Sequence, residues 1–387
     1  MKRKIFKAVE LILFMIYSRI YACFHRVDEK KVLFLSESHG ILDGNLKAVY
    51  DALGDEYEKK VYVKADRRQK GSFSKIDLWK DCTTAGYIML DDFFGLTSGL
   101  KLREGQELVQ LWHGSGAFKK FGFSRMNTGD KIKTVNTGYR KYTKVAVTSD
   151  PARACFAEAF DIPVNKVRAV GSPRTDMFFD KEKIDEARNR VYDSYPKLKN
   201  KKIILIAPTY RGRKVEDADY DFECLGLERI IESLDDSYHV ITKWHPALYN
   251  NIEAGKCRLP DYLSGRRENR ITDVSGYGDI NDILTISDIL VTDYSSVIFD
   301  YFLLNRPVIY FIYDKDEYSR DRGLYFDFND YIYGETASDS DELLAAIKTE
   351  NLHNELRKNF NEKFMKACDG KSTSRVIKWV FKGEYKQ

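Results

Sequence analysis

The histidine at position 113 stands in a sequence context suited to acid–base chemistry. It lies in the run Gln-Leu-Trp-His-Gly-Ser-Gly (110–116), at the end of a short apolar segment that has the composition of a strand. The adjacent glycines allow a ligand to approach the backbone closely. An imidazole there can act as a general base that takes a proton from an attacking hydroxyl. The alternative is a ring satisfied by backbone groups beneath the domain; we predict that His113 is catalytic.

A second group of polar residues is suited to holding a diphosphate. The run Ala-Pro-Thr-Tyr-Arg supplies Thr209 and Arg211, and the run Thr-Lys-Trp-His-Pro supplies Lys243 and His245. Both runs follow apolar segments typical of strands, and ligands of open parallel sheets bind outside the carboxyl ends of the strands. Arginine has the shape that best matches phosphate oxygens. We therefore predict that these four residues contact a nucleotide diphosphate.

The segment Val-Thr-Asp-Tyr-Ser-Ser (291–296) adds hydroxyl groups to the same predicted sheet edge. Thr292, Ser295 and Ser296 fall between an apolar strand and a segment with helical spacing. The free N–H groups at a helix start favour an anion, so these residues are predicted donor contacts. The alternative is an ordinary helix cap, since serine is a preferred capping residue. Asp300, one turn later, is predicted to hold a sugar hydroxyl or a base, or else to stabilise the helix start.

Two further arginines are candidate phosphate contacts. Arg174 lies in Gly-Ser-Pro-Arg-Thr-Asp (171–176), where a fixed turn would stand beside the guanidinium. It is suited to bidentate phosphate binding, and the alternative is a salt bridge to Asp176. Arg322 offers one more cation near the predicted site.

Composition and missing motifs exclude several classes. Formal net charge is +4 from 63 basic and 59 acidic residues, too balanced for a typical nucleic-acid binder. The six cysteines are scattered, so neither a zinc site nor a disulfide framework is predicted. The sequence contains no P-loop motif, no dinucleotide fingerprint after the first strand and no hydrolase nucleophile elbow. We predict no cofactor and no bound metal, and we leave the oligomeric state open.

The elements that must position these residues alternate along the chain. Apolar strand-like segments recur between helical spacings, and this alternation predicts parallel sheets. The segments lie at 32–35, 60–63, 87–90, 108–111 and 145–147, then at 202–206, 239–242, 289–291 and 308–311. A polar stretch over 180–202 separates the two series. The predicted fold is α/β, with two doubly wound Rossmann-like domains over 29–195 and 196–387 that face a cleft.

The first 28 residues predict an amphipathic helix. Basic residues precede an apolar run, but Glu10 and Arg19 leave only eight uncharged residues between them, far short of the roughly 20 that a spanning helix needs. On a helical projection one face collects Ile5, Val9, Ile12, Leu13, Ile16 and Ile20. We expect this face to lie on the anionic inner leaflet of the cell membrane, which would make the protein peripheral on the cytoplasmic side. The alternative is a first helix packed on its own domain.

Read in order, five motifs resemble those of the CDP-glycerol glycerophosphotransferase family of teichoic-acid synthesis. They are Trp-His-Gly (112–114), Gly-Ser-Pro-Arg-Thr-Asp (171–176), Ala-Pro-Thr-Tyr-Arg (207–211), Lys-Trp-His-Pro (243–246) and Val-Thr-Asp-Tyr-Ser-Ser (291–296). The resemblance covers nearly all of the chain. It implies a GT-B-like fold, with the nucleotide held mainly by the C-terminal domain and a lipid-linked saccharide or polymer acceptor approaching the N-terminal one.

The resemblance also assigns roles. It implies that His113 is the base, that His245, Ser295 and Ser296 contact the diphosphate and nucleotide, and that Asp300 touches the donor. The expected reaction is transfer of glycerol phosphate from CDP-glycerol to an acceptor hydroxyl with release of CMP, and CDP-ribitol is the alternative donor. The length is closer to that of priming transferases than of polymerases, which leaves processivity open. The rival functions are a GT-B glycosyltransferase that uses a nucleotide sugar and an inert nucleotide-binding scaffold.

Overall fold

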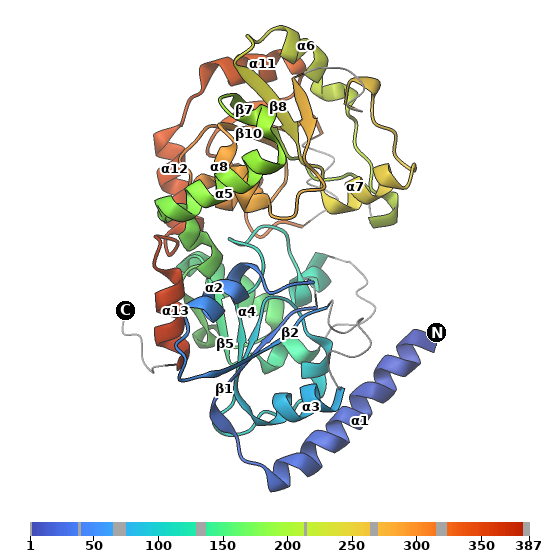
Figure 1. Cartoon of the computed structure of the whole chain (residues 1–387), viewed down its shortest axis with the longest axis vertical. Helices are drawn as coiled ribbons and strands as arrows, with labels where there is room; N and C mark the ends of the chain where they lie inside the picture. The colour runs from blue at the N-terminus through green and yellow to red at the C-terminus, as the bar shows by residue number, and fades with distance from the viewer. Residues whose placement is uncertain are drawn as a thin grey trace. The chain divides into compact units, whose positions relative to one another are not determined.

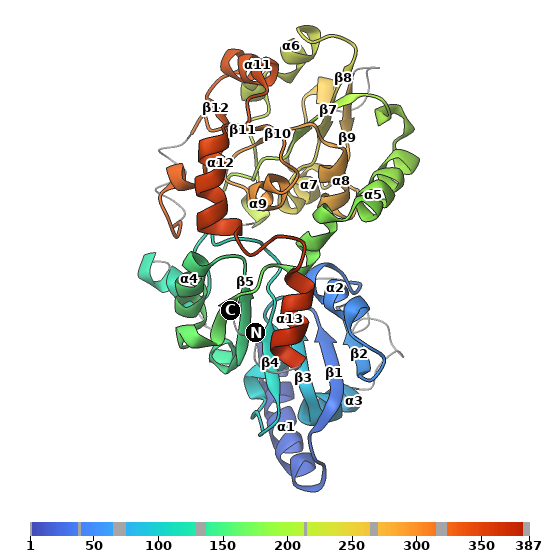
Figure 2. The same cartoon turned by 90° about the vertical axis from the view of Figure 1, so that its left-hand side faces the viewer.

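The computed structural model describes residues 2–37, 40–64, 75–128, 137–212, 215–263, 270–314 and 323–381. Its internal contacts divide the chain into two compact units. Unit 1 combines Met1–Asp176 with Glu362–Gln387, and unit 2 is Met177–Asn361. The predicted boundary between residues 195 and 196 therefore differs from the observed division, and the C-terminal segment returns to the first unit (Figures 1 and 2).

Unit 1 is built on one parallel sheet of six strands. Their order is β2-β1-β3-β4-β5-β6, and each neighbouring pair is parallel. The strands are β1 (Asp28–Leu35), β2 (Glu58–Tyr62), β3 (Ala85–Leu90), β4 (Glu107–Gln110), β5 (Lys144–Val147) and β6 (Val167–Ala169). The five strand segments predicted in this half are confirmed. The strand order reverses between β1 and β3, so a ligand site is expected beyond the carboxyl ends of these strands.

Unit 1 contains five α-helices within the described residues. They are α1 (Lys2–Phe24), α2 (Gly44–Ala52), α3 (Lys75–Thr84), α4 (Asp150–Phe160) and α13 (Ser372–Phe381). Helix α13 belongs to unit 1 because its apolar face packs into the core of that unit. Val376 and Trp379 join the buried cluster formed by Val32, Leu46 and their neighbours, and α13 lies beside α2 in both views (Figures 1 and 2).

Unit 2 repeats the architecture with a different strand order. Its six parallel strands run β12-β11-β10-β7-β8-β9, the doubly wound arrangement in which the order reverses between the first and fourth strands of the unit. They are β7 (Lys202–Ile206), β8 (Tyr238–Thr242), β9 (Ile271–Asp273), β10 (Ile289–Thr292), β11 (Val308–Phe311) and β12 (Glu335–Ala337). The reversal falls between β7 and β10, the strands that precede Thr209 and Ser295.

The α-helices in the described part of unit 2 lie around its sheet. They are α5 (Lys181–Ser194), α6 (Leu227–Glu232), α7 (Pro246–Glu253), α8 (Ile280–Ile286), α9 (Val297–Phe302), α11 (Ser340–Thr349) and α12 (Asn354–Phe360). Central strands such as β7 and β10 are almost completely buried, which explains their continuous apolar sequences. The core includes Ile204, Val240 and Val291. After β12 the chain is helical in α11, α12 and α13, with breaks at residues 350–353 and around Gly370, which has φ of 83°.

Helix α1 has two different faces. Phe14 is fully buried, and its ring centroid lies 5.9 Å from that of Trp79 in α3. The opposite face exposes Val9 (48%), Leu13 (52%) and Ile20 (59%). The helix therefore packs on its own unit by one face while an apolar stripe stays open to solvent. Among the described residues, no helix has the length and hydropathy needed to cross a membrane.

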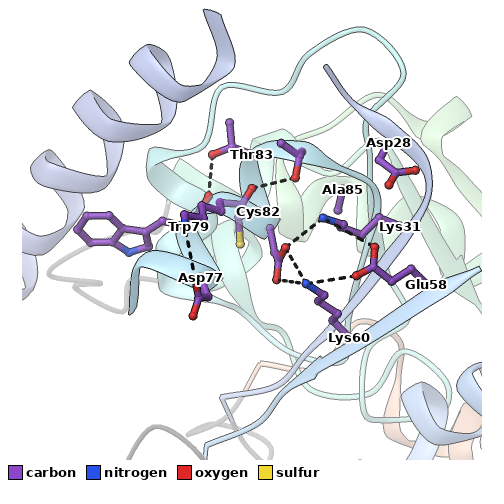
Figure 3. Close-up of polar contacts among 12 residues, drawn as sticks. Asp28, Lys31, Glu58, Lys60, Asp77, Trp79, Cys82, Thr83 and Ala85 are labelled. Carbon is purple, nitrogen blue, oxygen red and sulfur yellow. Dashed lines mark hydrogen bonds and ion pairs between the residues drawn. The ribbon is translucent and has the colours of Figure 1, made fainter. Parts of the chain in front are cut away.

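Polar contacts anchor α3 to the sheet, and so fix the helix on which α1 rests. The buried carboxylate of Asp81 accepts hydrogen bonds from Lys31 and Lys60, each at 3.2 Å, and from the Tyr62 hydroxyl. Figure 3 shows the two lysine side chains converging, with Glu58 beside them and Trp79 on the far side of α3. The buried charge is paired and hydrogen-bonded, as a charge in an interior must be.

Candidate functional site

His113 lies at the carboxyl edge of the unit 1 sheet, as predicted. Strand β4 ends at Gln110, and the His113 side chain that follows is exposed to solvent. Its Nδ1 lies 3.3 Å from the backbone carbonyl oxygen of Asp91, which follows β3. A carbonyl can only accept, so this contact requires a proton on Nδ1, and the neutral form of such a ring has its lone pair on Nε2. That is the tautomer a general base needs.

The neighbouring indole holds the His113 ring from one side. The two ring centroids are 4.5 Å apart, with an interplanar angle of 29°. Trp112 also stacks on Phe121, with ring centroids 4.6 Å apart. Trp112 has φ of 57°, a left-handed backbone that is uncommon outside glycine and persists only when its surroundings fix it. Because of this turn, the chain at His113 no longer follows the direction of the buried strand β4.

Arg174 belongs to the same edge of unit 1. Its backbone N–H donates to Asn45 Oδ1 at 2.9 Å, and its Nη2 donates to Ser115 Oγ at 3.3 Å. The predicted phosphate contact therefore lies close in space to the loop that carries His113. Asp176 has a different task, since its carboxylate accepts the N–H groups of Ser372 and Thr373 at 2.9 and 2.7 Å and so caps α13.

In unit 2, Thr209 and Thr292 form part of the framework at the reversal of strand order. Thr209 donates its backbone N–H and its hydroxyl to Asp293 Oδ1 at 2.7 and 3.0 Å. Thr292 donates its hydroxyl to the carbonyl of Ala207 at 2.7 Å. Both side chains are buried, and their contacts join the end of β7 to the end of β10. These contacts suit a structural role better than direct contact with a donor.

Arg211 is engaged by two carboxylates. Its Nη1 donates to Asp293 Oδ2 at 2.7 Å, and its Nη2 donates to Asp314 Oδ1 at 3.0 Å. Burial alone would lower the pKa of Arg211, but the two carboxylates raise it above its ordinary value. The guanidinium carbon also lies 5.4 Å from the ring centroid of Tyr294 and 5.3 Å from that of Tyr313. Arg211 thus ties together the ends of three strands, β7, β10 and β11.

Lys243 also stabilises a loop of unit 2 through hydrogen bonds. Its ammonium group donates to the carbonyl oxygens of Ser275 and Tyr277 at 3.1 and 2.7 Å, and so fastens the loop that follows β9. Burial lowers the pKa of Lys243, although Asp273 and Asp279 oppose this effect. The predicted phosphate contact is therefore occupied by backbone oxygens of its own unit.

His245 is placed as a donor group. The ring is exposed, and its Nδ1 accepts the backbone N–H of Ala247 at 3.1 Å, which caps α7. Because Nδ1 accepts, the neutral ring carries its proton on Nε2 and offers an N–H to a ligand oxygen. This is the opposite tautomer from that of His113. The two histidines are therefore suited to different roles, His113 to accepting a proton and His245 to donating a hydrogen bond.

The two serines after β10 differ from each other. Ser295 Oγ accepts the N–H of Val297 at 3.4 Å, which matches the predicted alternative of a capping residue. Ser296 is exposed and makes no capping hydrogen bond through its side chain. Asp300 is almost completely buried in α9. Burial raises the pKa of Tyr333, and the nearby carboxylate of Asp300 adds to this effect while Arg357 opposes it. Arg322 lies outside the described residues.

Several residues of these sites had no predicted role. Asn45, Trp112, Asp293 and Asp314 all contact predicted site residues. Asp293 and Trp112 lie inside recognised motifs, and their position next to candidate residues is a signal that could have found them. Asn45 belongs to no motif. No group of three or more histidine, cysteine or acidic side chains suited to a metal ion occurs in the part of the chain that the structure describes.

Two doubly wound units with polar groups at their strand ends define a GT-B-like architecture, and comparison with solved structures agrees. The wall teichoic acid polymerase TagF has a TM-score of 0.75 at 21% identity, over 99% of this chain and 98% of that one. The UDP-GlcNAc 2-epimerase of Neisseria meningitidis has a TM-score of 0.56 at 12% identity, over 91% and 100% of the two chains. These likenesses establish the fold.

Sequence comparison gives the family. The model of CDP-glycerol:poly(glycerophosphate) glycerophosphotransferases matches residues 16–382, and the chain belongs to this family. The teichoic acid poly(ribitol-phosphate) polymerase of Bacillus spizizenii is 38% identical over 91% of this chain. The teichoic acid glycerol-phosphate primase of Bacillus subtilis is 33% identical over 76% of this chain and 72% of its own length. The chain spans 56% of the length of the polymerase and 91% of that of the ribitol-phosphate primase of B. spizizenii, which is 29% identical over 92% of this chain.

Proposed function

We propose that this protein transfers a polyol phosphate from CDP-glycerol or CDP-ribitol to a hydroxyl of a membrane-linked teichoic-acid acceptor, with release of CMP. Family membership supports the reaction class. The observation that carries the proposal is that the two histidines have opposite kinds of partner at Nδ1, a carbonyl oxygen for His113 and a backbone N–H for His245. We infer from these partners that neutral His113 has a lone pair on Nε2 and that His245 has an N–H there. A phosphoryl transfer needs one group that accepts a proton and others that stabilise charge on phosphate oxygens.

In the proposed mechanism, His113 Nε2 takes the proton of the acceptor hydroxyl and becomes an imidazolium. The acceptor oxygen attacks the β-phosphorus of the donor in line, and the bond from that phosphorus to the bridging oxygen breaks. CMP leaves with the bond's electron pair. His245 Nε2–H and the hydroxyl of Ser296 donate to the diphosphate oxygens, where negative charge develops. Arg211 and Lys243 act indirectly, by fixing the strand ends that present these donors.

The protein acts, in this proposal, at the cytoplasmic face of the cell membrane as a peripheral enzyme. The support is the outward stripe of α1, where Val9, Leu13, Ile16 and Ile20 are each about half exposed or more. The sequence also places Lys2, Arg3, Lys4 and Lys7 at the start of this helix. Apolar burial combined with attraction between lysines and anionic lipid gives binding without a span. Such an attachment would bring a lipid-linked acceptor to the protein.

The test is a donor panel. Purified full-length protein is supplied with a short lipid-linked saccharide and, separately, with CDP-glycerol, CDP-ribitol or nucleotide sugars. We expect CMP release from a CDP-polyol and a product whose mass increases by one or more polyol phosphate units. The donor with the higher kcat/KM identifies the polyol. Nucleotide release from nucleotide sugars alone would establish the rival glycosyltransferase, and binding without turnover on any donor would support the inert scaffold.

A further inference from the structure

The side chain of Asn45 joins two segments that are far apart in sequence. Asn45 is the second residue of α2 and is 2% exposed. Its Nδ2 donates to the carbonyl oxygens of Leu111 and Trp112 at 3.2 and 2.8 Å. Its Oδ1 accepts the Ser172 hydroxyl and the Arg174 N–H, both at 2.9 Å. One carboxamide therefore links the loop after β4 to the turn after β6.

Only an amide in this orientation satisfies all four partners. Two carbonyl oxygens need a donor, whereas a hydroxyl and a backbone N–H can donate to an acceptor, and the Asn45 side chain provides both functions. An aspartate of the same shape would place negative charge against two carbonyl oxygens and would lose both donors. In a buried site a group left without its partner costs the full desolvation of that group.

The bond to Trp112 is the one that bears on catalysis. The Trp112 carbonyl belongs to the peptide that leads directly into His113, so the Asn45 bond fixes the orientation of that peptide. The Trp112 N–H is fixed as well, because it donates to Gln110 Oε1 at 2.8 Å. These two bonds, with the ring stack on Phe121, hold the left-handed turn at φ of 57°. Without them the strained turn would be free to relax.

We propose that Asn45 is a positioning residue for the transfer reaction. Its carboxamide locks the turn that presents the His113 ring, and at the same time it sets the backbone of Arg174 beside the same loop. The proposal rests on the proposed function, in which His113 is the base. A general base must lie within hydrogen-bond reach of the proton it takes, and a misplacement of about 1 Å can cost on the order of 100-fold in rate.

The test compares Asn45→Asp with a matched control, Gln106→Glu. Gln106 is a second buried carboxamide of unit 1, 6% exposed, and its Nε2 also donates to backbone carbonyls, among them Ala85 at 2.8 Å. It lies at the amino end of β4, the opposite end from His113. Both substitutions change an amide to a carboxylate of the same shape in similar surroundings. They differ in whether the segment that leads to His113 is affected.

We expect Asn45→Asp to lower kcat on the order of 100-fold while the KM for the CDP-polyol changes by no more than about threefold. Gln106→Glu is expected to lower the melting temperature comparably and to keep kcat near that of the wild type. Asn45→Ala, which removes the donors without adding charge, gives the same comparison if Asn45→Asp does not fold. A kcat for both Asn45 variants within threefold of the wild type, or equal losses in the control, would overturn the proposal.

A spectroscopic readout separates this proposal from the function on which it rests. In protein with ¹⁵N-labelled histidine, the His113 signals of the wild type should show the Nδ1–H tautomer. Asn45→Asp should shift them toward a mixture of tautomers, and Gln106→Glu should not. A wild type that releases no CMP from any donor would refute the proposed function, and the histidine signals would still decide whether Asn45 positions the ring. Unchanged His113 signals in the Asn45 variants would refute the positioning role alone.

Discussion

The guanidinium of Arg211 lies 2.7 Å from the carboxylate of Asp293, a side chain with no solvent exposure at the end of β10. The same carboxylate receives two hydrogen bonds from Thr209, which follows β7. These contacts therefore link the ends of β7 and β10, the two strands between which the strand order of unit 2 reverses. Loss of this ion pair should mainly lower the stability of unit 2, and any loss of catalysis should follow from that.

Arg211→Ala should lower the free energy of unfolding of unit 2 by about 3–5 kcal/mol, because it leaves the buried carboxylate of Asp293 without a countercharge. Arg211→Lys should rescue only part of this, since an ammonium group cannot match two carboxylates bidentately. Urea unfolding measures both. The matched control is Arg140→Ala, which breaks the exposed pair with Asp161, whose side chains are each 52% exposed. It should cost about 1 kcal/mol or less. Equal losses at the two positions would contradict the structural role of Arg211.

His245→Asn should weaken donor binding while leaving α7 intact. Asparagine is a good helix cap, so it can accept the Ala247 N–H in place of Nδ1. It does not reproduce the imidazole Nε2–H. A hydrogen bond to a charged group contributes about 1.5–3 kcal/mol, so the Kd for the CDP-polyol should rise roughly tenfold or more. Calorimetric titration without acceptor measures this. His245→Ala, which also removes the cap, should show the same loss of affinity together with a lower stability; unchanged affinity in both variants would remove His245 from the donor site.

Stability should fall in mild acid because of His239. Burial, aided by nearby lysines, lowers the pKa of His239 from 6.5 to about 4. The unfolded chain then binds this proton as the pH falls below about 6.5, whereas the folded chain does not until about pH 4. Unfolding is therefore favoured progressively across that window, by roughly 3 kcal/mol in total. His239→Gln should flatten this part of the stability profile, as measured by urea unfolding between pH 4 and 7. Parallel profiles for the two proteins would show that His239 does not contribute.

The outward stripe of α1 should bind anionic vesicles. Ile16 and Ile20 are 53% and 59% exposed, so replacing both with asparagine should hardly change stability. Each side chain contributes about 1.5–3 kcal/mol when fully buried in an apolar phase, so the double variant should lose on the order of 100-fold in vesicle affinity. Co-sedimentation with phosphatidylglycerol vesicles measures this. The control replaces Val164 and Phe179, which are 48% and 51% exposed elsewhere on the surface. Equal binding by both double variants would refute the stripe as the contact.

The fold was predictable because parallel strands buried on both faces leave continuous apolar runs in the sequence. Residues 203–206 and 289–291 are examples, and both proved to be strands with nearly complete burial. The position of His113 at the carboxyl edge of the sheet was predictable for the same reason, because it directly follows one of these apolar runs and stands beside glycines. The helical spacing of α1 was equally visible. One face packs on unit 1, as the predicted alternative had it, and contact of the exposed face with a membrane stays a prediction.

Long-range pairing could not be predicted. Arg211 was expected to contact a diphosphate. Its observed partners, Asp293 and Asp314, lie 82 and 103 residues away in the sequence, and no local sequence pattern indicates these contacts. The return of α13 to unit 1 has the same origin, because the Asp176 carboxylate that caps it is 196 residues from Ser372. Asn45 carries no motif at all. Its importance arises only from four partners that the fold assembles.

The most direct test of the account is His113→Ala. Two quantities are measured on the same folded preparation: single-turnover release of CMP from the preferred CDP-polyol in the presence of acceptor, and the Kd for that donor without acceptor. Loss of a general base should slow CMP release by at least about 10²- to 10⁴-fold, while the Kd stays close to that of the wild type because donor binding is assigned to unit 2. CMP release at a near-normal rate would contradict the assignment of His113 as the base.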